Sequence, residues 1–62
     1  MFTYRLYCLD GADEIRLADE IEAGGDAEAI AKAREQHRNA HMCEIWLFDR
    51  LVATLNAKDL AG

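Results

Sequence analysis

Two histidines and a cysteine follow one another at short spacing in the middle of the chain, as His37-x-x-x-His41-x-Cys43. Histidines four residues apart share one face of a helix, and a cysteine thiolate is a common zinc ligand. Cys8 could supply a fourth ligand if its strand lies beside that of Cys43. Structural zinc sites usually contain a second ligand pair at fixed spacing, and the chain has none. We therefore expect neither a metal nor a cofactor.

Cys8 and Cys43 are the only cysteines, so they permit at most one internal disulfide. Each lies at an apolar position of a predicted strand, where an unpaired cysteine behaves as a small buried hydrophobic residue. Two cysteines are also too few for a disulfide-rich secreted scaffold. We therefore expect two free thiols in a reducing cytoplasm, with a disulfide as the alternative.

The other residue types that carry chemistry form no recognisable catalytic site. Asp10, Asp13 and Glu14 cluster at a predicted turn, but their spacing does not match a calcium-binding loop. The chain contains no serine and no glycine-rich loop of the kind that holds phosphate. A chain of 62 residues also leaves little room for a catalytic cleft. We expect no enzymatic activity.

The formal net charge of −5 is concentrated in the first half of the chain. An acidic surface repels phosphate, so nucleic-acid binding is disfavoured. The longest strongly apolar run covers residues 45–48, which is far too short to span a membrane. The N-terminus shows no signal-peptide pattern. These features predict a cytoplasmic protein that does not associate with membranes.

Hydrophobic periodicity predicts one domain over residues 1–62 with the element order β-β-α-β-β. The strands are expected over residues 2–9, 14–22, 42–48 and 51–56, and the helix over residues 26–41. Turns are expected at residues 10–13 and 49–50, and residues 57–62 are expected to form a loose tail after an ordered core of residues 2–56. Asp19 interrupts the apolar face of the second strand, so a bulge or an exposed strand end is expected near residues 18–20.

The predicted helix begins at Asp26, whose carboxylate can cap the free N–H groups of the first turn. Ala27, Ile30 and Ala31 are expected to form a narrow face that packs closely against the sheet, with Ala33, Arg34 and His37 continuing or flanking it. The predicted fold class is therefore α+β, with one helix packed on one face of a four-stranded, mainly antiparallel sheet.

Three strings carry a resemblance to a known group of proteins: Tyr4-Arg5-Leu6-Tyr7 ahead of Leu9-Asp10-Gly11, then Asp26 to Arg34, then Cys43-Glu44-Ile45-Trp46 leading to Arg50-Leu51-Val52-Ala53. With the order of elements, they resemble a family of short uncharacterised bacterial proteins, a domain of unknown function. The resemblance covers about residues 4–54 and implies a hairpin, an alanine-rich helix and a second hairpin. It implies no activity, substrate or site.

A single helix covers only one face of a four-stranded sheet, and strand alternation divides the apolar residues between the two faces. The face expected to lie against the helix carries Tyr4, Leu6, Cys8, Cys43, Ile45 and Leu47. The opposite face defines a candidate interface of Tyr7, Leu9, Trp46, Phe48 and Val52. Uncovered apolar patches mark interaction sites.

The sequence thus predicts a small protein-interaction module, either a homodimer or an adaptor for another protein. Arginine stems that shield the rings of the uncovered face would be the alternative to an interface. A small-molecule or metal-binding protein that uses His37, His41 and Cys43 ranks second. Binding of single-stranded nucleic acid on the sheet face ranks last, because few basic residues lie near that face.

Overall fold

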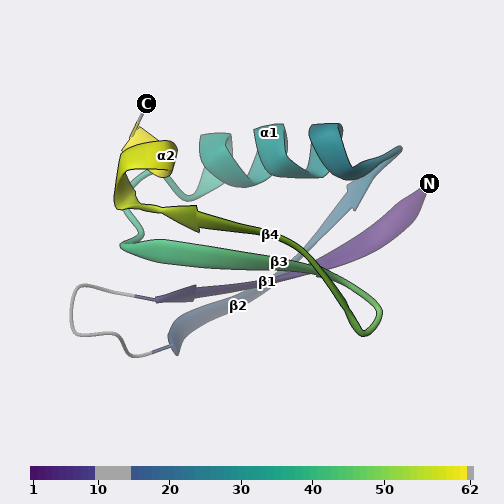
Figure 1. The fold of residues 1–62 in the computed structure, drawn as a ribbon, viewed down its shortest axis with the longest axis horizontal. Coiled ribbons are helices and arrows are strands. Elements are labelled where there is room, and N and C mark those ends of the chain that lie inside the picture. The colour runs from purple at the N-terminus through teal and green to yellow at the C-terminus, as the bar shows by residue number, and fades with distance from the viewer. Residues whose placement is uncertain (10–14, 62) are drawn as a thin grey trace.

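A computed structural model describes residues 1–9 and 15–61 of the chain. Its elements are β1 (Phe2–Leu9), β2 (Ile15–Ala23), α1 (Asp26–Gln36), β3 (Met42–Leu47), β4 (Arg50–Asn56) and α2 (Ala57–Ala61). The strands form one sheet in the order β2-β1-β3-β4, and both helices lie on the same side of it (Figure 1). The predicted α+β class and the order β-β-α-β-β are confirmed, with α2 as an addition at the end.

The sheet consists of two antiparallel hairpins joined side by side. β1 pairs with β2, and β3 pairs with β4. The central strands β1 and β3 join the hairpins through an antiparallel ladder that runs from Arg5 opposite Trp46 to Leu9 opposite Met42.

The hydrophobic core lies between the sheet and the helices. Tyr4, Leu6 and Cys8 alternate along β1 and are buried, as are Cys43 and Ile45 of β3. Leu47 is partly buried and packs against this core. These six residues occupy the face predicted to lie against the helix.

Helix α1 differs from the predicted helix in its end, its cap and its buried face. It ends at Gln36, with His37 as a non-helical C-cap, and Gly25 is its N-cap without any side-chain cap hydrogen bond. The buried residues are Ala29 and Ala33, whereas the predicted Ala27 and Ala31 are exposed. Ala33 was predicted to continue or flank the face, but its predicted centre was wrong, because closely spaced alanines carry almost no hydrophobic contrast around the helix. Ile30 does pack, partly buried, against the core.

The strand irregularities lie elsewhere than predicted. Asp19 pairs in regular register with Leu6, so there is no bulge at residues 18–20, and the register shift falls between Cys8 and Leu9 instead. The second hairpin turns at residues 48–49, one residue before the predicted turn, because Leu47 pairs with Arg50. The predicted turn at residues 10–13 lies outside the described residues.

Residues 57–61 form helix α2 and not the loose tail that the sequence predicts. The Asp59 N–H donates to Asn56 Oδ1 (3.0 Å), and the Asn56 N–H donates to Asp59 Oδ2 (3.2 Å). This reciprocal pair is a capping box, which satisfies two N–H groups at a helix start. Leu60 of this helix is 2% exposed and completes one end of the core.

Candidate interaction surface

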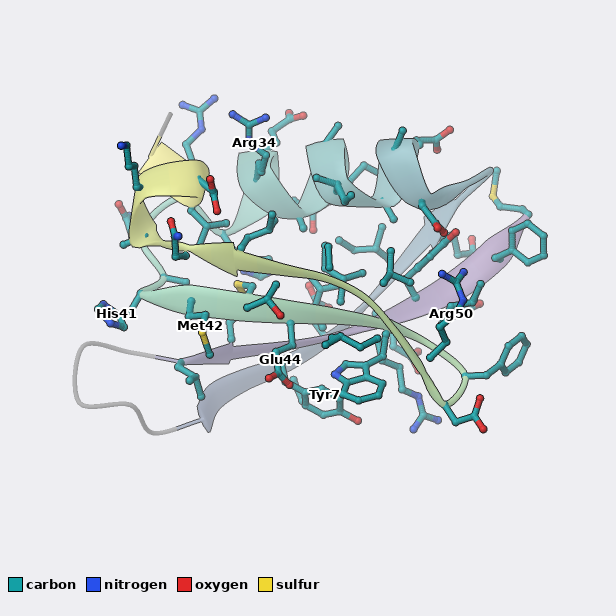
Figure 2. The ribbon with its side chains drawn as sticks, viewed as in Figure 1. Tyr7, Arg34, His41, Met42, Glu44 and Arg50 are labelled. Carbon is teal, nitrogen blue, oxygen red and sulfur yellow. A yellow bond between two sulfur atoms is a disulfide. The ribbon has the colours of Figure 1, made fainter. Side chains whose placement is uncertain are left out.

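The sheet face opposite the helices carries a row of large side chains. Tyr7, Leu9, Met42 and Trp46 are all half-buried there, together with Glu44. Figure 2 shows Tyr7, Met42 and Glu44 pointing away from both helices. Strand alternation places them, because each is the neighbour of a core residue of β1 or β3. We call this surface the uncovered face.

Apolar side chains on the uncovered face form pairs across neighbouring strands. Leu9 lies opposite Met42, and Trp46 lies opposite Leu51, which is 45% exposed. Such directly opposite side chains are in contact range. Between the two pairs, Glu44 lies opposite Tyr7 and accepts a hydrogen bond of 3.2 Å from Trp46 Nε1. The indole is thereby oriented along the face.

Charged side chains also lie on the uncovered face. Arg5 lies opposite Trp46 on the central ladder, and Glu20 of edge strand β2 lies opposite Arg5. Arg5 and Glu20 form an exposed ion pair with an N–O distance of 3.8 Å. The same two residues line an open hollow with Tyr7, Ala18 and Asp19. The uncovered face therefore carries apolar pairs that are interrupted on the central strands by Arg5 and Glu44, with Glu20 on edge strand β2.

Phe48 lies at the end of this surface, in the two-residue turn between β3 and β4. Its side chain is 86% exposed, and its φ of 56° lies in the left-handed region that disfavours side chains other than Gly, Asn and Asp. A large apolar side chain thus occupies a position that favours glycine and gains little burial within its own chain.

Val52 does not belong to the uncovered face. It packs partly buried against the core, since the register shift between Ile45 and Trp46 leaves Val52 as an extra residue of β4. The structure therefore places Tyr7, Leu9 and Trp46 of the predicted interface on the uncovered face and Phe48 at its end. Met42 and Leu51 join this face and were missed by the sequence analysis. Alternation with Glu44 and Trp46 could have found Met42.

A contact network beneath the face fixes the β3–β4 turn. The Tyr4 hydroxyl donates to Asp26 Oδ1 (2.8 Å), and the Arg50 guanidinium donates to both Asp26 oxygens (3.4 Å each). Burial, followed by the hydrogen bond to Asp26, raises the pKa of Tyr4. The hydrogen bond from Tyr4, followed by that from Arg50, lowers the pKa of Asp26. Arg50 follows the turn directly, so the network joins the start of β4 to α1 and β1 through an exposed ion pair.

The candidate metal ligands do not form one group. The prediction that His37 and His41 share a helix face was wrong, because α1 ends at Gln36. His37 Nε2 lies 3.2 Å from Asp19 Oδ2, and the His41 backbone N–H donates to the Leu9 carbonyl (2.9 Å). Within residues 1–9 and 15–61, no three His, Cys, Asp or Glu side chains gather in a way that could hold a metal ion.

Cys8 and Cys43 form a disulfide, so the expectation of two free thiols was wrong. The two residues are directly opposite on β1 and β3, with Cα atoms 4.0 Å apart. Opposite positions on neighbouring antiparallel strands bring side chains close together, whereas sequence alone did not reveal that these strands are neighbours. Both cysteines lie in the core, and the bond connects the two hairpins.

Comparisons with known protein families, curated proteins and solved structures found no match to this chain. Across the described residues, no helix has the length and apolar character needed to cross a membrane.

Proposed function

We propose that the protein is a small non-catalytic interaction module that forms a homodimer through its uncovered face. The observation that carries this proposal is the row formed by Tyr7, Leu9, Met42, Trp46 and Leu51 on the face that α1 and α2 leave open. Aromatic residues and methionine are enriched at interface centres, where a few such side chains supply most of the binding energy.

A second copy of the chain is the occupant that this surface favours. The face presents Arg5 together with Glu20, so a two-fold arrangement can place opposite charges face to face. The central strands β1 and β3 are 8 and 6 residues long and span about 20–26 Å, and four strands about 4.8 Å apart are roughly 19 Å wide. The resulting face of roughly 400–500 Å² per protomer lies below the size of standard stable interfaces, so we expect a weak dimer.

Pairing through the sheet edges is less favourable than pairing through the face. Edge strand β2 carries Asp19, Glu20 and Glu22, so two copies of it would bring like charges together. Edge strand β4 contains the register shift beside Leu51, and such irregularities protect sheet edges against pairing. Both edges therefore carry features that oppose a continuous sheet across two chains.

The conformation of Phe48 supports a role in binding. A non-glycine residue at positive φ destabilises the folded chain, and such residues cluster at functional sites. Its ring is 86% exposed at the end of the uncovered face, where a partner could cover it. We assign Phe48 as a peripheral anchor of the dimer.

We also propose a cytoplasmic location, which rests on the low cysteine content of the chain. The disulfide between Cys8 and Cys43 then has to be compatible with a reducing compartment.

Trp46 is the single tryptophan of the chain, so its fluorescence reports directly on the uncovered face. We expect the emission maximum to shift to longer wavelength on dilution, as dimer dissociation exposes the indole to water. A Phe48→Ser/Leu51→Ser variant should show the long-wavelength emission at every concentration. Phe2→Ser is the matched control, because exposed Phe2 lies on the helix side of β1, and it should behave as the unaltered chain does. If the emission maximum were independent of concentration in the unaltered chain and in Phe2→Ser as well as in the double variant, the proposal would be contradicted.

A further inference from the structure

We propose that the Cys8–Cys43 disulfide is a redox-sensitive lock that holds the two hairpins together, and that a dithiol reductant opens it. The inference concerns the joining of β1 to β3 and goes beyond the proposed dimer. It starts from the position of the bond in the topology, its burial and the size of the core.

The bond lies in the β1–β3 ladder. Among the described strands, this ladder alone pairs the first hairpin with the second. In the strand order β2-β1-β3-β4, only β1 and β3 connect the first hairpin to the second. Cys8 lies opposite Cys43 next to the last pair of this ladder, Leu9 and Met42. Without the covalent bond, separation of the hairpins would require only the breaking of this ladder and of the helix packing above it.

The disulfide also forms a large part of a small core. Cys8 and Cys43 are 3% and 0% exposed and are two of the eleven buried hydrophobic residues in the described part of the chain. They are 35 positions apart in sequence, so the bond restrains a long loop of the unfolded chain, and the stabilisation by a disulfide grows with loop length. For a domain of this size, that stabilisation is comparable to the whole free energy of unfolding. The redox state therefore determines how much of the chain is folded.

A cytoplasmic disulfide is usually transient and redox-sensing, so this step of the argument rests on the proposed location. The opening reaction is thiol–disulfide exchange with a dithiol. One reductant thiolate attacks a sulfur of the Cys8–Cys43 bond and forms a mixed disulfide, and the second reductant thiolate then displaces that cysteine. The chain gains two electrons and two protons as two thiols, and the reductant leaves as a disulfide.

Burial of both cysteines makes the exchange depend on conformational opening. A thiolate cannot reach sulfurs that are covered by the helices and the sheet, so reduction should proceed through molecules in which the β1–β3 ladder has separated. Reduction should therefore be slow in the native state and should accelerate in mild denaturant. Oxidation restores the bond when the two strands pair again.

The test uses the full chain in its oxidised form, incubated with dithiothreitol in mild denaturant, exchanged without air into denaturant-free buffer that still contains dithiothreitol, and compared with an untreated sample. We expect the reduced protein to melt roughly 15 °C or more below the oxidised protein. Amides that bridge β1 and β3 should gain more hydrogen exchange than those within each hairpin. Air oxidation should restore the original melting temperature.

A Cys8→Ala/Cys43→Ala variant separates the lock from general effects of the reductant. It should melt near the reduced protein and should not respond to dithiothreitol. If this variant does not fold, the exchange measurement on the unaltered chain still decides the question. Melting temperatures within about 2 °C for the oxidised and reduced chains would overturn the proposal, as would uniform gains in exchange across all strands. All measurements can be repeated in the Phe48→Ser/Leu51→Ser background, so that failure of the dimer does not affect the outcome.

Discussion

The hydroxyl of Tyr4 donates a hydrogen bond of 2.8 Å to Oδ1 of Asp26, 22 positions later in the chain. Because Arg50 also donates to Asp26, one carboxylate connects β1, the start of α1 and the start of β4. The sequence analysis assigned Asp26 as a helix cap, but the structure uses its carboxylate for contacts between elements. These contacts hold the β3–β4 turn in place, and with it the end of the uncovered face.

Replacing Tyr4 by Phe keeps the buried ring and removes the donor to Asp26. We expect the melting temperature to fall by several degrees, because a hydrogen bond to a charged group is lost. Tyr7→Phe is the matched control, since the Tyr7 side chain lies on the opposite face and makes no such bond. Thermal melts of the dilute proteins compare the two variants. Equal melting temperatures for both would contradict the importance of the network.

The same pair of residues predicts how stability depends on pH. The pKa of Asp26 is lowered from 3.8, so its contribution is present above about pH 3.8 and is lost as the pH falls through the folded-state pKa. The pKa of Tyr4 is raised from 10.0, so its contribution is present below that pH and is lost as the pH rises through the folded-state pKa. The stability difference between the unaltered chain and Tyr4→Phe should be largest between these limits and should shrink beyond both. Denaturant titrations at a series of pH values measure this stability difference. A difference between the unaltered chain and Tyr4→Phe that does not change with pH would mean that the contact contributes nothing.

The buried face of α1 is tested by adding volume to it. Ala33 is buried under the helix, so Ala33→Leu should overpack the core and destabilise the protein by about 1–3 kcal/mol. Ala31→Leu makes the same change on the exposed side of the helix and should alter stability by no more than about 0.5 kcal/mol. Urea denaturation measures both. If Ala31→Leu destabilised the protein more than Ala33→Leu, Ala31 would lie on the buried side of the helix, as predicted from the sequence.

The anchoring of α2 predicts that the C-terminal segment contributes to stability. Leu60→Ala should cost about 2–5 kcal/mol, because the leucine is buried in the core. Lys58→Ala in the same helix is the control, since Lys58 is exposed. Chemical denaturation that shows equal stability for both variants would mean that α2 is detached from the core in solution.

Phe48 should affect folding and association in opposite directions. Phe48→Asn places a residue that tolerates positive φ in the turn, so we expect stability to rise by about 1 kcal/mol. Self-association should weaken at the same time, because the exposed ring is lost. Phe2→Asn removes another exposed ring without relieving positive φ and should not stabilise the chain. Denaturation and light scattering on the same samples test the two effects, and unchanged association in Phe48→Asn would remove Phe48 from the interface.

Alternation in β1 and β3 was sufficient to predict which of their residues are buried, because each strand has one strongly apolar face. The same reasoning failed for Val52, since a register shift in β4 depends on pairing with β3 and has no local signal. It also failed for the buried face of α1, where Ala27, Ala29, Ala31 and Ala33 are indistinguishable by hydropathy. The capping box of α2 was visible as Asn56 and Asp59 three residues apart, but its helix is too short to show periodicity.

The disulfide and the candidate metal ligands show a different limit. Whether Cys8 meets Cys43 depends on the strand order, which local sequence patterns do not specify. The zinc hypothesis assumed a helix that continued to His41, and α1 ends at Gln36 so that the chain can return to β3. Only long-range pairing could decide between free thiols, a metal site and a disulfide.

The most direct test of the proposed dimer is the molar mass of the unaltered oxidised chain by sedimentation equilibrium over a wide concentration range. We predict a mass that approaches twice the 7.0 kDa of the chain at high concentration. The Phe48→Ser/Leu51→Ser variant should remain at the chain mass, and the Phe2→Ser control should dimerise normally. A single mass of 7.0 kDa for the unaltered protein at the highest concentration would contradict the homodimer and leave the uncovered face to a different partner.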